Sequence, residues 1–167
     1  MFKKLINKKH VKNEKGLTLI ELLAVIVILA IISAIAIPAI GNIIENSRYN
    51  AVKADAINVL NAGQLYYTEN PAGDTNATGG STVKSITVDQ LKSAKYLDTA
   101  GKIPLTAIVE NANPKTLSDA VVTYSGSKTV TFDGATIEGI NKDIEKGSGK
   151  GGHTISDSNQ TKPETGN

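Results

Sequence analysis

One carboxylate, Glu21, stands at the start of a long apolar segment. From Leu22 to Ile40 the only side chain with a polar atom is that of Ser33. A charge at the middle of a bilayer costs about 2.5–3.5 kcal/mol on insertion scales and less near the edge, so a carboxylate at this position needs a partner or a function. The chemistry open to Glu21 is ion pairing in a medium of low dielectric constant, because no acid or base partner for catalysis stands near it in the sequence.

The other residues that could do chemistry form no catalytic pattern. The two histidines, His10 and His153, lie toward opposite ends of the chain, and there is no cysteine for a thiol nucleophile, a disulfide or a thiolate metal site. Four acidic residues are too scattered for a calcium loop, namely Asp119, Asp133, Glu138 and Asp143. We therefore predict a protein that is not an enzyme and has no cofactor or metal site, and we expect His153 to be solvated.

The apolar segment has the length of a membrane span. Its 19 residues, Leu22 to Ile40, make a helix of about 28 Å, close to the roughly 30 Å of bilayer hydrocarbon. The residues before it carry six lysines and one glutamate, namely Lys3, Lys4, Lys8, Lys9, Lys12, Lys15 and Glu14. This asymmetry predicts a single-pass membrane protein with a cytoplasmic N-terminus, and it places everything after Ile40 outside the cytoplasm.

Three simpler interpretations of this region compete. A secretory signal peptide has an apolar core of about 7–15 residues followed by a small-residue cleavage site, whereas here the core is longer and Gly16 precedes it. A plain membrane anchor explains the lysines and the apolar segment but not the spacing of Gly16 and Glu21 around Leu17. A buried core helix of this length with so few polar residues is not favoured, so on physical grounds alone a single-pass anchor comes first.

The segment Gly16-Leu17-Thr18-Leu19-Ile20-Glu21, after a lysine-rich leader, resembles the class III signal peptide of type IV prepilins. This signal is shared by type IV pilins and by the pseudopilins of competence and type II secretion systems. In that family a membrane peptidase cuts after the glycine, and the new N-terminal residue, usually phenylalanine, is methylated. The resemblance therefore implies cleavage between Gly16 and Leu17 and N-methylation of Leu17, where leucine is a departure from the family pattern.

The resemblance extends further along the chain, to about Tyr67. The family's assembly glutamate falls on Glu21, and its helix-softening proline falls on Pro38. In lacking cysteine, the chain resembles Gram-positive members of the family more than Gram-negative ones. Removing the leader leaves 12 basic and 15 acidic residues, so the net charge of +2 for the whole chain is no argument for nucleic-acid binding.

Residues 17–69 are predicted to form one long helix, with a membrane-spanning part at about 17–40. Pro38 removes a backbone donor and Gly41 adds backbone freedom, so we expect a kink or a softened turn there. After Ile44 the pattern becomes amphipathic, with an apolar stripe at steps of three and four residues. The stripe comprises Val52, Ala56, Val59, Leu60, Gly63, Tyr66 and Tyr67. The helix is expected to end at Asn70 to Gly73, before a surface loop at 74–81.

Residues 70–145 are predicted to form an exposed α+β headpiece, with a small antiparallel sheet packed on the long helix. A capping box at Thr87-Val88-Asp89-Gln90 predicts a short helix to about Tyr96, with Leu91 and Ala94 or Lys95 on its inner side. Residues 102–114 are turn-rich, with Ile103, Leu105, Ile108 and Val109 able to pack. Strands are expected at 120–124, 129–132 and, after the turn Asp133-Gly134, at 135–140. Five alternating residues would face the helix, namely Val122, Tyr124, Val130, Phe132 and Ile137.

Residues 146–167 lose nearly all apolar side chains, and we predict a disordered tail. The segment Lys162-Pro163-Glu164-Thr165-Gly166 is similar to a sortase signal, but Lys162 stands where that signal has leucine and no apolar segment follows it. Wall anchoring by that route is therefore not predicted.

The function implied by the resemblance is that of a filament subunit. Such a subunit waits in the cell membrane, is trimmed by prepilin peptidase, and is assembled with copies of itself by an assembly ATPase acting through a platform membrane protein. A surface pilus serving adhesion, aggregation or motility is the first interpretation. A competence or type II secretion pseudopilin is an alternative, and an unassembled single-pass protein with a ligand-binding exterior domain is another.

Overall fold

The computed structural model describes residues 18–71, 84–149 and 151–156. The chain divides into two compact units, one ending at Ala39 and one beginning at Ile40, and each is described by itself. One helix, α1 (Leu19–Glu69), supplies all the described structure of the first unit and continues into the second. The predicted long helix is therefore confirmed from Leu19 onward, and it ends one residue before Asn70, where its stop was expected.

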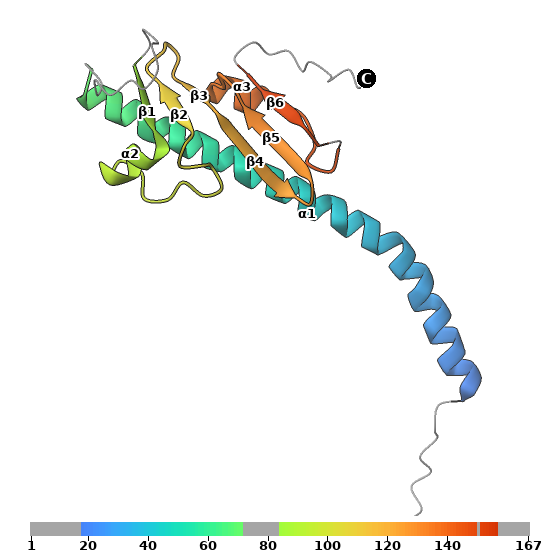
Figure 1. The fold of residues 1–167 in the computed structure, drawn as a ribbon. Helices are drawn as coiled ribbons and strands as arrows, with labels where there is room; N and C mark the ends of the chain where they lie inside the picture. The colour runs from blue at the N-terminus through green and yellow to red at the C-terminus, as the bar shows by residue number, and fades with distance from the viewer. Residues whose placement is uncertain (1–17, 72–83, 150, 157–167) are drawn as a thin grey trace, which may run out of the picture. The chain divides into compact units, whose positions relative to one another are not determined.

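The second unit places two small sheets along α1 (Figure 1). The first sheet is antiparallel in the order β1 (Ser85–Thr87), β2 (Ile108–Glu110), β3 (Thr116–Ser118). The second has the order β4 (Ala120–Ser125), β5 (Lys128–Phe132), β6 (His153–Ile155). Strands β4 and β5 are antiparallel, whereas β5 and β6 are parallel. The short helices are α2 (Val88–Ser93) and α3 (Ile137–Lys142), so the fold is α+β, as predicted.

The hydrophobic core lies between α1 and the sheets. Every member of the predicted apolar stripe is buried, from Val52 to Tyr67. Tyr49 extends the stripe by one turn, and its ring meets Tyr124 of β4 edge to face, with 5.2 Å between ring centroids. At Gly63 a Cβ atom would stand 2.5 Å from Cγ1 of Val109, so the glycine lets β2 approach the helix closely.

The β4–β5 hairpin forms as the sequence predicts. Gly126 and Ser127 make its two-residue turn, and Gly126 has φ +52°, a conformation that glycine adopts without strain. Four of the five residues expected to alternate toward the helix are buried on these two strands, namely Val122, Tyr124, Val130 and Phe132.

The capping box at Thr87 is confirmed, but the predicted length of its helix is wrong. The Thr87 side chain accepts from the Gln90 N–H at 3.2 Å and the Gln90 side chain accepts from the Thr87 N–H at 2.9 Å. The helix ends at Ser93 and not near Tyr96, and Lys95 then adopts φ +63°. The inner side is consequently formed by Val88 and Leu91, while Ala94 and Lys95 are exposed.

The strand predicted at 135–140 is a helix instead. Thr136 accepts a hydrogen bond from the Gly139 N–H at 3.0 Å and so caps α3, while Ala135 makes only an isolated bridge to Leu117. Ile137 is therefore on α3 and not on the sheet face. Residues 102–114 were predicted to be rich in turns, and this prediction missed strand β2. Leu105, which was expected to pack in the core, is exposed.

The tail prediction is wrong for residues 146–149 and 151–156. These residues belong to the second unit and include β6, whose register pairs Val130 with His153 and Phe132 with Ile155. Ile155 is buried in the core. Residues 157–167, with the sortase-like sequence, and the predicted loop at 74–81 lie outside the described residues.

Candidate processing and assembly site

The start of α1 places Glu21 in a specific hydrogen-bonding arrangement. Thr18 precedes the helix, and its carbonyl accepts the hydrogen bond from the Leu22 N–H at 3.1 Å. Oε2 of Glu21 accepts from the Thr18 N–H at 2.9 Å and from the Thr18 hydroxyl at 2.8 Å. The Glu21 N–H in turn donates to Oγ1 of Thr18 at 3.3 Å. The two residues thus form a reciprocal capping box at the N-terminus of α1, which begins at Leu19.

This capping box gives Glu21 the partner that sequence reasoning had missed. The signal was present as the Thr-x-x-Glu spacing from Thr18 to Glu21, the same pattern as Thr87 to Gln90. A carboxylate in the first turn also lies at the positive end of the helix dipole. Both hydrogen bonds from Thr18 reach Oε2, so within the described residues Oε1 has no hydrogen-bond partner.

The remaining sequence-predicted site residues are distributed along and before the helix. Gly16 and Leu17, the predicted cleavage and methylation residues, lie outside the described residues. Pro38 and Gly41 lie inside α1, which is continuously helical through both. A Cβ atom at Gly41 would meet nothing within 4 Å. The predicted kink at Pro38 and Gly41 stays a prediction.

The first unit of the structure exposes its apolar side chains. Among the described residues, α1 is the one helix long and apolar enough to cross a membrane by length and composition, and none of its most apolar window is buried. Large apolar residues from Leu19 to Ile37 are half or more exposed, apart from Val25, which is 49 % exposed. No protein surface covers this part of the helix within the described chain.

Residues 11–37 match the family model described as the prokaryotic N-terminal methylation motif. This segment is the class III signal peptide of type IV pilins and pseudopilins. The match spans 27 of the 167 residues and includes Gly16, Leu17 and Glu21. No curated protein and no solved structure matches the chain.

The methylation motif supports a type IV pilin-like or pseudopilin precursor with a transmembrane helix. It implies processing by prepilin peptidase and filament assembly. The capping box adds that helix α1 starts at Leu19, two residues beyond the bond that this peptidase is expected to cut.

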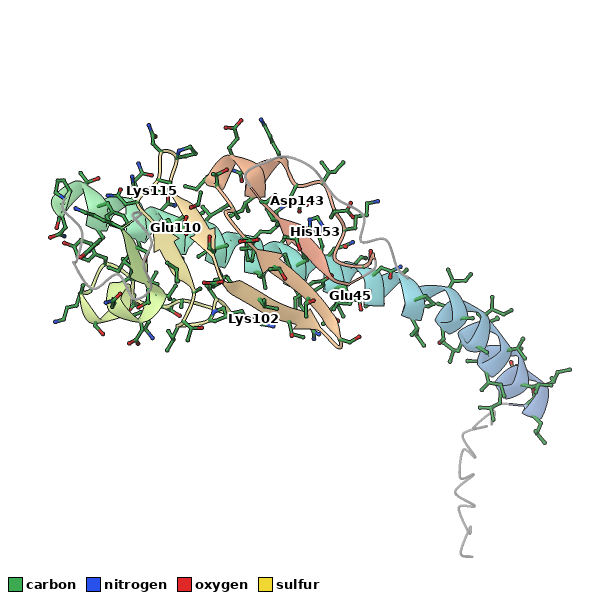
Figure 2. All side chains as sticks on the ribbon, turned by 45° about the horizontal axis from the view of Figure 1, so that its top comes forward. Glu45, Lys102, Glu110, Lys115, Asp143 and His153 are labelled. Atoms are coloured by element: carbon green, nitrogen blue, oxygen red, sulfur yellow. The ribbon has the colours of Figure 1, made fainter. Side chains whose placement is uncertain are left out.

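A second polar cluster lies in the second unit of the structure, which is called the headpiece from here on (Figure 2). It is formed by Tyr49, Lys53, Asp143 and His153. Oδ2 of Asp143 accepts from the Tyr49 hydroxyl at 2.8 Å and from Nζ of Lys53 at 3.0 Å. Its Oδ1 lies 2.8 Å from Nε2 of His153 on β6. The Asp143 side chain is only 4 % exposed. The cluster thus joins α1, the segment after α3 and β6, and the expectation that His153 is solvated is wrong.

The electrostatics of this cluster favour an ionised Asp143. Burial would raise the pKa of its carboxyl group, but hydrogen bonds from His153, Tyr49 and Lys53 and the charge of Lys53 outweigh burial and lower the pKa to about 2. Burial, followed by the hydrogen bond to Asp143, raises the pKa of Tyr49 far above its usual value. The carboxylate of Asp143 therefore forms a buried ion pair with Lys53 and also accepts a hydrogen bond from the Tyr49 hydroxyl.

Glu45 forms a further junction where α1 enters the headpiece. Its carboxylate pairs with Nζ of Lys128 at 2.6 Å and accepts from the Ser125 hydroxyl at 3.2 Å. The hydrogen bond from Lys128 is the main cause that lowers the pKa of Glu45. One residue later, Oδ1 of Asn46 accepts from the Ser148 N–H at 2.9 Å. These contacts hold the hairpin end and the C-terminal segment against the same turn of α1.

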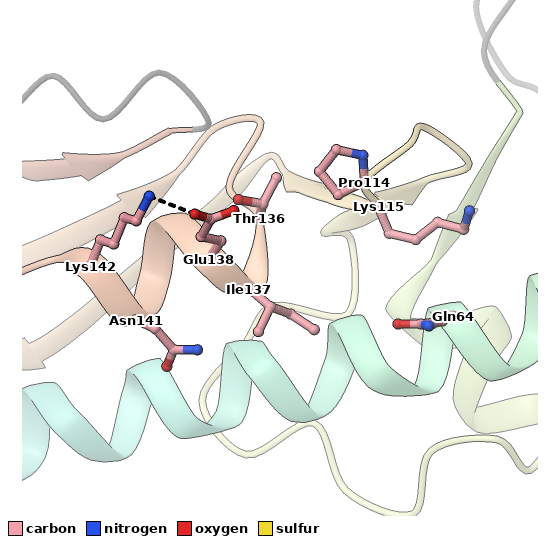
Figure 3. Close-up of a pocket in the computed structure, with 8 residues that line it drawn as sticks. All are labelled: Gln64, Pro114, Lys115, Thr136, Ile137, Glu138, Asn141 and Lys142. Atoms are coloured by element: carbon pink, nitrogen blue, oxygen red, sulfur yellow. Dashed lines mark ion pairs between the residues drawn. The ribbon is translucent and has the colours of Figure 1, made fainter.

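A shallow pocket lies between α1, α3 and the β2–β3 connection (Figure 3). Its volume is about 490 Å³, and Gln64, Asn141 and Ile137 contribute to its lining. The Lys142–Glu138 ion pair stands at its edge. The lining residues offer hydrogen-bond donors and acceptors but no nucleophile beside a base. Among the residues that the structure describes, no group of three or more acidic or histidine side chains could hold a metal ion.

Proposed function

We propose that the chain is the structural subunit of a type IV pilus-like filament that serves adhesion, aggregation or motility at the cell surface. The subunit is stored in the cell membrane with its N-terminus in the cytoplasm, cleaved after Gly16, and extracted from the bilayer into a homopolymer. Prepilin peptidase, an assembly ATPase and a platform membrane protein are its partners. The observation that carries this proposal is the methylation motif at residues 11–37.

The start of α1 supports a specific role for Glu21 in assembly. In a filament core built from apolar helices, an unpaired carboxylate is costly. Thr18 already satisfies Oε2, and Oε1 can accept from the positive α-amine that cleavage creates on Leu17 of a neighbouring subunit. Capping and intersubunit pairing are therefore compatible at one carboxylate. Because such a pair is favourable only with good geometry, it selects one axial stagger between subunits.

Two substitutions separate the two roles of Glu21. Glu21→Gln keeps a capping box, since glutamine is the other residue that forms this motif, but removes the charge. Glu21→Ala removes both the cap and the charge. We expect both variants to be inserted and processed and to give few or no filaments. The exposed Asp89→Asn, in the first turn of α2, is the matched carboxylate control and should assemble normally.

The measurement is electron microscopy of sheared surface material, with an immunoblot of the membrane fraction for each variant. Normal filament yield from Glu21→Gln would refute the charge pairing and leave the cap as the role of Glu21. Long surface filaments containing the native chain support the pilus. Their absence, with processed protein retained in the envelope, would favour the pseudopilin alternative.

A further inference from the structure

The pocket between α1, α3 and the β2–β3 connection is large enough for a small molecule (Figure 3). Its volume of about 490 Å³ falls within the roughly 300–1,000 Å³ of small-molecule sites. The core fixes one wall, because Thr136 caps α3 and Ile140 of that helix is fully buried. Ile137 of the same helix lines the pocket and is only half-buried.

A smaller pocket of about 280 Å³ adjoins the first, since Gln64, Pro114 and Lys115 line both. The smaller pocket adds Thr68, with its hydroxyl group, and Asn113, with its amide. The two pockets therefore form one depression beside α1, which we call the Gln64 groove. All of its lining residues belong to the headpiece.

Two amide side chains stand on opposite walls of the larger pocket. Figure 3 shows Gln64 on α1 and Asn141 on α3, with Ile137 between them. Among the residues that the structure describes, neither amide has a hydrogen-bond partner. A side-chain amide offers two N–H donors and one carbonyl acceptor. Each amide can therefore bind two neighbouring hydroxyl groups of one ligand, while Ile137 contacts its carbon atoms.

The charged side chains at the groove are already engaged. Lys142 pairs with Glu138 at the edge of the larger pocket. Lys115 extends away from α3 (Figure 3). Its Nζ donates to the carbonyl oxygen of Ala112 at 3.1 Å and lies 5.7 Å from the ring centroid of Tyr67. The described lining of the larger pocket thus offers amides and aliphatic carbon to a ligand, with its charges directed to other protein groups.

We propose that the Gln64 groove binds a neutral saccharide. The C–H face of a sugar ring packs against Ile137 and Pro114, and its hydroxyl groups exchange hydrogen bonds with the amides of Gln64 and Asn141. A purely apolar ligand would leave both amides unpaired, and an acidic sugar would bring its carboxylate toward Glu138. The proposal gives a ligand class to the adhesion in the proposed function, on which it rests for display of the headpiece at the cell surface.

The test is direct binding by the full chain, kept in a detergent without a sugar headgroup because a glycoside detergent would compete. The chain has no cysteine, so a dye on Ser47→Cys, an exposed position, labels it at one site. This chain is applied to an array of neutral, sialylated and sulfated glycans, and the bound glycans are then titrated by calorimetry. Gln64→Leu and Asn141→Leu each remove one amide. Asn50→Leu, at an exposed amide about 21 Å from Gln64 on the same helix, is the matched control.

We expect at least one neutral glycan to bind, and each groove variant to weaken that binding about two- to tenfold, as loss of one hydrogen bond does. The control should bind as the native chain does. Near-ultraviolet circular dichroism shows whether each variant is folded, and because the two groove variants lie on different elements, either one carries the test. Binding of acidic glycans alone, binding of no glycan, or equal binding by all variants overturns the proposal.

Electron microscopy of filaments separates this proposal from the proposed function. Gln64→Leu should still assemble into filaments while its glycan binding weakens, because its side chain is exposed on the headpiece. A native chain that binds a neutral glycan but forms no filaments overturns the filament and leaves the saccharide site standing. Native filaments that bind no neutral glycan overturn the saccharide site alone.

Discussion

Replacing Asp143 by asparagine tests whether the buried cluster holds the headpiece together. Asparagine keeps the shape of the side chain and one acceptor oxygen but removes the charge that faces Lys53. We expect the headpiece to remain folded at neutral pH and to lose a large part of its free energy of unfolding, because the Lys53 side chain is only 15 % exposed and would keep an unpaired charge.

The pKa of Asp143 gives the scale of this loss. A folded-state pKa of about 2, against an ordinary value of 3.8, corresponds to about 2 kcal/mol at neutral pH. Breaking a buried pair by removing one partner costs about 3–5 kcal/mol in other proteins. We therefore expect Asp143→Asn to lower the free energy of unfolding by about 2–4 kcal/mol.

The same pKa gives the pH dependence and its sign. Because the folded-state pKa is lowered, the contribution of Asp143 to stability is fully present above the ordinary pKa near 4 and is lost as the pH falls toward about 2. Native protein should thus lose this contribution between about pH 4 and pH 2, whereas Asp143→Asn should lack this part of the acid transition.

The assay is urea unfolding of the full chain in detergent, followed by near-ultraviolet circular dichroism. All five tyrosines lie in the second unit and there is no tryptophan, so the signal reports the headpiece. Asp133→Asn, at an exposed carboxylate, is the control and should change stability by less than about 0.5 kcal/mol. An Asp143→Asn variant that matches this control, with an unchanged acid profile, would show that the cluster contributes nothing to stability.

Two further predictions concern glycines. Gly63→Ala should lower the free energy of unfolding by about 1 kcal/mol or more, because its Cβ would stand 2.5 Å from the stiff, buried side chain of Val109, outweighing the gain in helix propensity. Gly41→Ala, where nothing lies within 4 Å, is its control in the same urea unfolding assay and should leave headpiece stability unchanged.

Gly16→Val should block leader removal, since a branched side chain does not fit where the peptidase reads glycine. Mass spectrometry should find native chains that begin at Leu17 and variant chains that keep the leader, and trimmed variant chains would contradict the role of Gly16.

The long helix and its buried face could be predicted because their signals are local. The stripe from Val52 to Tyr67 repeats with the period of one helix, so its burial depends only on a partner being present. The capping boxes at Thr87 and Thr18 are equally local, although only the first was recognised from its spacing. The match of residues 11–37 to the methylation motif likewise depends on contiguous residues.

The errors have two causes, one local and one distant. Residues 135–140 carry apolar residues at positions that suit a strand or a short helix, and the cap from Thr136 to the Gly139 N–H selects the helix. His153 stands among glycines and appeared solvated. Its partner Asp143 is 10 residues away, and that carboxylate is in turn held by Tyr49, 94 residues earlier in the chain. No periodic pattern in the sequence carries such a pairing.

The parallel pairing of β6 with β5 has a consequence for biogenesis. Tyr49 and Lys53 emerge from the ribosome about 90 residues before Asp143, their common acceptor, and β6 emerges later still. The headpiece therefore cannot close until β6 has been made, so its folding depends on contacts between residues far apart in the sequence. Until β6 is made, the β5 edge and the core site of Ile155 lack their partner, so a chain stopped before β6 should be more sensitive to proteolysis than the complete headpiece.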